Sequence, residues 1–257
     1  MLNLKQHLNT NYIGQEIRYL ESVSSTNDYL KKIAKDIDSE GLIVIANEQT
    51  KGKGRLGRTW ITTKDDSIAI SILLKPNVNI ERASLITMIA GVSVVEGIQN
   101  STDITPSIKW PNDIYIDNKK LGGILAESSF NNGTLEHIVL GIGININQTN
   151  FDKRLESSAT SLKKVCGKEL DKEVIIANIL NVFEKYYNLF KSNDLMAFMD
   201  KLKHNSCVLG KNVAIINNNE TYIGKAINIT DSGSILIKLN NGEIREFVNG
   251  DISLRRI

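Results

Sequence analysis

The segment from residue 47 to residue 60 combines closely spaced glycines with cations, which is a combination suited to holding an anion. Gly52, Gly54 and Gly57 follow an apolar run that is typical of a buried strand. Glycine lets the backbone approach a ligand closely, and consecutive N–H groups in such a loop can form an anion-binding nest. Basic side chains lie between and beside these glycines, and arginine can pair bidentately with a phosphate. They are Lys51, Lys53, Arg55 and Arg58. The loop therefore predicts a site for a phosphorylated or carboxylated small molecule.

Two known phosphate-binding loops do not explain this segment. A Walker loop requires Lys-Ser/Thr after its second glycine, whereas Arg58 and Thr59 follow Gly57. Residues 52–57 match the Gly-x-Gly-x-x-Gly pattern of dinucleotide sites, but β-branched and aromatic residues follow them instead of a helix. In isolation, the loop would be interpreted as a glycine-rich basic surface turn.

Three further stretches could contribute polar groups to a site. Ser25, Thr26 and Asn27 begin a helical pattern, where they cap the helix or offer polar groups and free N–H groups to a ligand. Residues 107–128 indicate two strands around a turn at 117–119, with a bend at Pro111 and Lys120 just after the turn. A lone lysine at such a place is most often a solvated surface residue. Residues 137–147 alternate glycines and asparagines with isoleucines, so one strand face could accept a flat ligand or a crossing backbone.

Composition and periodicity indicate the elements that position these residues. The 257 residues are 41% hydrophobic and 23% charged, with a net charge of +2 that gives no bulk attraction to nucleic acid. Strands are expected at 41–47 and 67–74, a broadly apolar helix at 81–99, and two helices within 171–203. Short strands separated by turns from about residue 207 predict a small antiparallel barrel. We expect one domain at 1–206 and a second domain at 207–257.

Other classes of site and location are not indicated. Cys166 and Cys207 have neither disulfide-framework nor zinc-ligand spacing, and no histidine cluster is present. No apolar run is long enough to span a membrane, and no secretory signal is seen. We therefore expect a cytoplasmic protein.

Taken in order, the four stretches closely resemble the biotin protein ligases. The stretches are Ser25–Asn27, Gly52–Trp60, Lys109–Leu125 and Gly141–Asn145. The resemblance implies an α+β fold, with a mixed sheet backed by helices as in class II synthetases and then an SH3-like barrel. It implies an enzyme that uses ATP and Mg²⁺ to join biotin to a lysine of the carrier protein of a biotin-dependent carboxylase, such as acetyl-CoA carboxylase. The intermediate is biotinyl-5′-AMP.

The resemblance also assigns roles to individual residues. Lys120, Arg55 and Asp113 would be catalytic: Lys120 would contact the biotin carboxylate and the α-phosphate, and Asp113 is a candidate base and a candidate metal ligand. The residues implied to bind biotin are Ser25, Thr26, Asn27, Gln49, Gly52, Lys53, Arg55, Trp60, Lys120, Gly122, Gly123, Gly141 and Gly143. The residues implied to bind ATP are Lys53, Arg55, Arg58, Asn112, Asp113, Asn145 and Arg255.

The chain departs from the family pattern at two places. Lys53 stands where the loop more usually has an arginine, so it keeps the charge but loses the bidentate fork. The stretch before Ser25 is too short for the winged helix of repressor members, so no sequence-specific DNA binding is expected. Two alternatives stay open: a lipoate or octanoate ligase, and a regulatory protein that binds biotinyl-AMP without transferring it. A homodimer is compatible with the family, but the sequence does not give the oligomeric state.

Overall fold

The computed structural model describes residues 3–79, 82–218 and 220–254, and its largest element is a mixed seven-stranded sheet. Its strands lie in the order β1 (Ile17–Val23), β2 (Ile43–Gln49), β3 (Ser67–Leu74), β7 (Thr134–Asn145), β6 (Lys119–Asn131), β5 (Asp113–Ile116) and β4 (Ser107–Lys109). β1 and β2 are parallel, whereas the other neighbours are antiparallel. The mixed sheet that the resemblance implied is confirmed.

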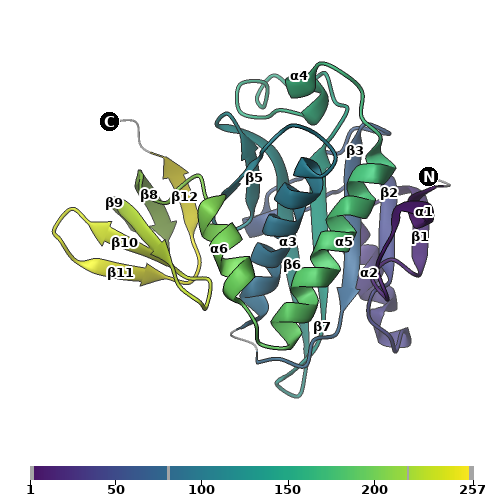
Figure 1. Cartoon of the computed structure of the whole chain (residues 1–257), viewed down its shortest axis with the longest axis horizontal. Coiled ribbons are helices and arrows are strands. Elements are labelled where there is room, and N and C mark those ends of the chain that lie inside the picture. The colour runs from purple at the N-terminus through teal and green to yellow at the C-terminus, as the bar shows by residue number, and fades with distance from the viewer. Residues whose placement is uncertain (1–2, 80–81, 219, 255–257) are drawn as a thin grey trace.

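Long helices cover one face of this sheet (Figure 1). They are α3 (Ala83–Gln99), α5 (Lys172–Lys191) and α6 (Met196–His204). α3 is buried along most of its length because it packs between the sheet and α5. This explains why its sequence is apolar on nearly every side instead of on one stripe. The expected helix at 81–99 is therefore found, with residue 81 outside the described residues.

The opposite face of the sheet is covered only in part. α2 (Thr26–Ile33) packs there over a small apolar cluster that includes Leu73 and Val139. Ser71 lies two residues from Leu73 on β3, and the register places it beside Gly141 of β7. Because successive strand residues point to opposite faces, the small residues Ser71, Gly141 and Gly143 share the face of Leu73 and Val139. Small residues therefore leave a hollow beside α2.

The last strands form a separate antiparallel sheet, shown in yellow-green in Figure 1. Its order is β11 (Ile244–Phe247), β10 (Ile235–Leu239), β9 (Glu220–Ile229), β8 (Asn212–Asn217) and β12 (Asp251–Leu254). Contacts near β4, at the edge of the main sheet, help to join this part of the chain to it. Ser206 bridges Ile108 of β4 in a parallel manner, and Trp110 Nε1 donates to Gly233 O at 2.9 Å. The separate C-terminal sheet is as expected, whereas a domain boundary between 206 and 207 stays a prediction.

Several elements were not predicted from the sequence. They are the edge strand β1, the terminal strand β12, and the short helices α1 (Leu4–His7) and α4 (Leu162–Cys166). β1 mixes apolar, charged and polar residues over seven positions without a regular alternation, and it is recognisable mainly by its pairing with β2. Within the described ranges, no helix is both long and apolar enough to cross a bilayer. The cytoplasmic location stays a prediction.

The crossing of α3 and α5 depends on a glycine. A Cβ added at Gly97 would lie within 2.7 Å of the backbone nitrogen of Ile179. We expect Gly97→Ala to lower the free energy of unfolding by about 1–3 kcal/mol, because the two backbones would have to separate. Chemical denaturation followed by circular dichroism measures this change.

Gly91 on the same helix provides the matched control. Its added Cβ would meet only side-chain atoms, at 3.7 Å or more. Gly91→Ala should keep or raise the stability, by up to about 1 kcal/mol from helix propensity. Equal destabilisation by both substitutions would mean that close helix packing at Gly97 is not the cause.

Candidate active site

The four stretches meet around one cleft of about 330 Å³, which lies over the small-residue face of β3, β6 and β7. One end of the cleft lies against the first turn of α2, and most of the loop at 52–60 lines the cleft. The predicted site residues that line it are Ser25, Thr26, Asn27, Gln49, Lys53, Arg55, Arg58, Trp60, Asn112, Asp113, Lys120, Gly123, Gly141, Gly143 and Asn145.

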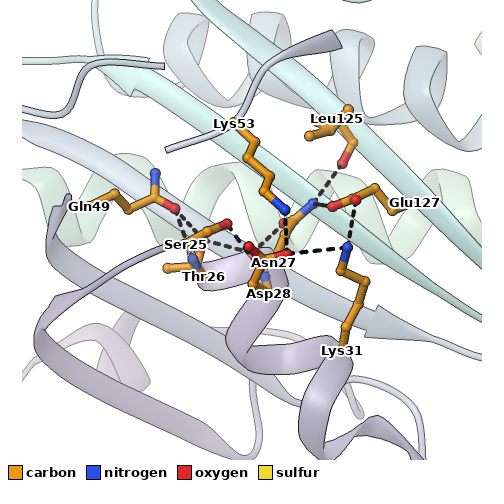
Figure 2. A network of polar contacts seen from close by, with 10 residues as sticks. Ser25, Thr26, Asn27, Asp28, Lys31, Gln49, Lys53, Leu125 and Glu127 are labelled. Atoms are coloured by element: carbon orange, nitrogen blue, oxygen red, sulfur yellow. Dashed lines mark hydrogen bonds and ion pairs between the residues drawn. The ribbon is translucent and has the colours of Figure 1, made fainter. Parts of the chain in front are cut away.

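Hydrogen bonds fix the polar side chains at the α2 end (Figure 2). Ser25 is the N-cap, and its Oγ accepts from Asp28 N at 3.4 Å. Gln49 Oε1 accepts from Thr26 N at 2.8 Å and from Thr26 Oγ1 at 3.0 Å. The Gln49 amide is therefore oriented by the helix start before it meets any ligand.

Asn27 is held against a glycine. Its Oδ1 accepts from Ser71 Oγ at 2.6 Å, and its Nδ2 donates to Glu127 Oε2 at 2.8 Å. A Cβ added at Gly141 would lie 2.4 Å from Asn27 Oδ1, so any larger residue would displace the amide. The buried Asn27 thus shapes the pocket wall, while its amide is already used by protein groups.

The glycine-rich loop has a defined fold instead of an open turn. Gly54 N donates to Arg58 O at 2.8 Å, and Trp60 N donates to Gly52 O at 2.9 Å. Between them, Arg55–Gly57 forms a short 3₁₀ turn in which Gly57 has a φ of 72°. These bonds bring the cations of the loop to the edge of the cleft.

The two loop arginines reach different parts of the molecule. Arg55 Nη1 donates to Asn112 Oδ1 at 2.9 Å, and Arg58 pairs with Asp251 of β12. Burial lowers the pKa of Arg55, while Asp251 and Asp113 act to raise it. Because an arginine pKa lies far above neutrality, Arg55 stays a cation. The loop thus presents fixed positive charge to the cleft.

Lys120 lies near the middle of the site. Its Nζ is 2.7 Å from Asp113 Oδ1 and 5.9 Å from the centre of a Trp60 ring. The Trp60 indole lies directly on Gly143, where an added Cβ would come within 2.6 Å of the ring. The indole N–H is buried and has no hydrogen-bond partner among the described residues. It could therefore donate to a ligand.

Three predicted site residues have surroundings that the expectation did not include, and a fourth cannot be compared with it. Gly122 does not line the cleft, because alternate residues of β6 face opposite sides and only Gly123 faces the ligand side. Gly52 lines a neighbouring hollow outside the loop, and its added Cβ would meet Trp60 O at 2.4 Å. The Lys53 ammonium pairs with Asp28 at 2.7 Å instead of being free for a phosphate. Arg255 lies outside the described residues.

Sequence reasoning missed several residues of the site. Ser71 lies under Thr26 and Asn27, and Asp251 reaches the cleft from the C-terminal sheet. The segment after β7 also closes one side of the cleft, with Phe151, Asp152 and Leu155. The serines within the apolar run 67–74 are a signal for a small polar strand face. Asp251 gives no such local signal, because its role comes from long-range packing.

The acidic residues do not form a preassembled metal site. Within residues 3–79, 82–218 and 220–254, no three His, Cys, Asp or Glu side chains are close enough to hold an ion together. Asp113 lines the cleft, but its carboxylate is engaged by Lys120. A magnesium ion would fit here only with most of its ligands supplied by substrate phosphates and water.

Comparisons with known proteins agree with this geometry. A model of the biotin/lipoate A/B protein ligase family matches residues 19–145, and one of the biotin protein ligase C-terminal domain matches residues 208–255. The bifunctional ligase/repressor BirA of Bacillus subtilis strain 168 is 34% identical over 249 residues, which are 96% of this chain and 76% of that protein. The chain belongs to the biotin protein ligases.

Solved structures of biotin protein ligases share the fold. The ligase from Aquifex aeolicus in complex with biotin and ATP is 31% identical, with a TM-score of 0.83, and the match covers 95% of this chain and 100% of that chain. The biotin–[acetyl-CoA-carboxylase] ligase of Mycobacterium tuberculosis is 27% identical over 229 residues, covering 87% of this chain and 83% of that protein. As a biotin protein ligase, this protein is an enzyme.

The ion pair between Arg58 and Asp251 generates a prediction about the ligase loop. Asp251→Asn should speed amide hydrogen exchange across residues 52–60 by roughly two- to fivefold, because an exposed ion pair contributes up to about 1 kcal/mol. Exchange mass spectrometry measures this rate. Glu243→Gln, which removes the partner of Arg245 at 2.8 Å on the same sheet, should leave the loop unchanged. Unaltered exchange in Asp251→Asn would show that this contact does not hold the loop.

Proposed function

We propose that this ligase joins biotin to a lysine of the biotin carboxyl carrier protein of a biotin-dependent carboxylase, through biotinyl-5′-AMP. One observation carries the proposal: a single cleft has oriented hydroxyl and amide groups at one end and fixed cations along the rest. Such a cleft suits a molecule with a polar, uncharged head and an anionic tail. The bound biotin and ATP of the Aquifex aeolicus structure support this choice.

The α2 end is suited to the ureido ring of biotin. Ser25, Thr26 and Gln49 offer both donors and acceptors there, and the Gln49 amide is already oriented by Thr26. The floor of Gly141 and Gly143 has no side chains, so fused rings and an alkyl chain can lie flat on the strands. Trp60 contributes an apolar wall with its free N–H.

The cationic part is suited to the first chemical step. A carboxylate oxygen of biotin attacks the α-phosphorus of ATP, the bond to the β-phosphate bridging oxygen breaks, and pyrophosphate leaves. Both reactants are anions, so Lys120, Arg55 and Arg58 would offset their repulsion and the charge that develops in the transition state. Asn112 holds the Arg55 guanidinium in place for this role. Magnesium bound with the nucleotide would supply further charge neutralisation.

The second step transfers the acyl group to the carrier. A lysine amine attacks the carbonyl carbon of the mixed anhydride, the bond to the phosphate oxygen breaks, and AMP leaves. The amine must lose a proton, and Asp113 lies in the cleft beside Lys120 as the candidate base. In this assignment Lys120 stabilises charge in both steps. Asn145, whose Nδ2 is held by Thr160 O at 3.0 Å, would orient the nucleotide side.

Two alternative functions must be distinguished from this proposal by experiment. A lipoate ligase would use the same general fold but a different acid, and a regulatory protein would form or bind the adenylate without labelling a carrier. We favour biotin because the loop and the Lys109–Asp113 segment follow the biotin ligase pattern. The lack of repressor activity and a homodimeric state stay predictions.

Exchange of labelled pyrophosphate into ATP tests the adenylation step. We expect exchange with biotin but not with lipoate, and Lys120→Ala should slow it by about a hundredfold or more. Lys119→Ala removes the exposed neighbour on the same hairpin and should leave the rate unchanged. No exchange with biotin from the folded protein in the presence of Mg²⁺ would contradict the proposal. Labelling of a purified carrier protein then separates a ligase from a regulatory protein.

Ser71 tests the biotin end of the cleft. Ser71→Ala removes the hydroxyl that lies 2.6 Å from Asn27 Oδ1 and 2.8 Å from Thr26 Oγ1. We expect a loss of biotin affinity of roughly three- to tenfold, measured by calorimetry, because two pocket residues lose a buried partner. Ser93→Ala is the control, since Ser93 is equally buried but its hydroxyl donates to Ile89 O within α3. Equal effects of both changes would place biotin elsewhere.

A further inference from the structure

Four alternating charges connect the main sheet to the glycine-rich loop (Figure 2). Glu127 on β6 lies 2.6 Å from Lys31 on α2, and Lys31 lies 3.3 Å from Asp28. Asp28 Oδ1 in turn lies 2.7 Å from Lys53 Nζ on the loop. The chain of charges thus begins beside the cleft floor and ends at the segment that covers the cleft.

Asp28 occupies the position that links these parts. It lies in the first turn of α2, directly after the pocket residues Thr26 and Asn27, and its backbone N–H bonds the N-cap Ser25. Burial acts to raise the pKa of the Asp28 carboxyl, but hydrogen bonds from Lys53 and Lys31 outweigh it and leave the pKa below its ordinary value. Asp28 is therefore an anion at neutral pH, and it attracts the loop.

The remaining contacts of the loop lie elsewhere. At its base, Thr50 N and Lys51 N donate to Val23 O and Ser24 O. On the far side, Arg55 and Arg58 are tied to Asn112 and Asp251. Among the described contacts, the pair of Asp28 and Lys53 is the one that joins a loop side chain to α2.

We propose that Asp28 is a positioning residue that holds the loop of residues 52–60 closed against α2, and so sets how long the acyl adenylate stays in the cleft. The inference rests on the proposed function, because it concerns retention of that intermediate. Loss of the ion pair frees the loop at the biotin end, and opening there lets the adenylate leave and water enter.

This role also explains the lysine at position 53. A carboxylate shared between two ammonium groups needs compact point charges, and Lys31 and Lys53 both approach the same Asp28 oxygen. A lysine stem reaches this oxygen with one donor, whereas the planar fork of an arginine suits a carboxylate with two free oxygens. The departure at Lys53 is thus matched to Asp28.

The test follows release of the adenylate. The whole protein is loaded with tritiated biotin and ATP without carrier, free substrates are removed, and loss of label is followed by rapid filtration. Asp28→Asn should speed release by roughly three- to tenfold, while adenylate formation at saturating substrates changes little. Asp28→Glu, which keeps the charge, should retain the adenylate, and so should Glu243→Gln, which breaks a comparable pair away from the cleft.

A double-mutant cycle separates the ion pair from an effect on α2 itself. Lys53→Gln leaves the helix untouched and should also speed release, and the double variant should release no faster than the worse single variant. Additive effects, or wild-type release in Asp28→Asn, would overturn the proposal. Failure of the wild type to form adenylate with biotin would instead remove the proposed function, so the two failures are distinguishable.

Discussion

The site depends on side chains that lie directly against the backbone of β7. Where β7 passes under α2 and the loop, one of its faces must therefore carry no side chains. Asn27 occupies the space that a Cβ of Gly141 would take, and the Trp60 indole occupies that of Gly143. These two contacts come from different segments, yet both need the same strand face to be bare. The cleft exists because β3 and β6 continue this face with Ser71 and Gly123 at neighbouring positions.

The cations of the cleft are all positioned by partners of their own. Lys120 is paired with Asp113, Arg58 with Asp251 and Lys53 with Asp28, while Arg55 bonds the neutral Asn112. A charge that is already held in place costs less to orient when an anionic substrate arrives. Arg55 differs from the other three cations because its hydrogen-bond partner is a neutral amide and not a carboxylate.

The elements that were predicted best from the sequence are those that a local residue pattern determines. The alternation of β3, the broad apolar surface of α3 and the bend at Pro111 follow from period and turn chemistry, and all are found. The glycine face of β7 was also readable, since its glycines and isoleucines alternate. The edge strand β1 was missed because its half-exposed, mixed pattern becomes a strand only through its partner.

Roles that arise from long-range pairing could not be read in this way. No local pattern links Asp28 to Lys53, and nothing near Asp251 indicates a contact with Arg58. The displacement of Gly122 from the cleft has a simpler cause, since adjacent strand residues cannot face the same side. The family resemblance located the four stretches, whereas the partners that hold them are properties of the folded chain.

The distance along the chain between Arg58 and Asp251 has a consequence during synthesis. The two residues are 193 positions apart, and the loop contact cannot form until the ribosome has made the C-terminal sheet. At a translation rate of about 5–20 residues per second, the loop waits roughly 10–40 s for this partner. The strands of the main sheet and the glycine face are therefore synthesised before the residue that pairs with Arg58 and fixes the cover of the cleft.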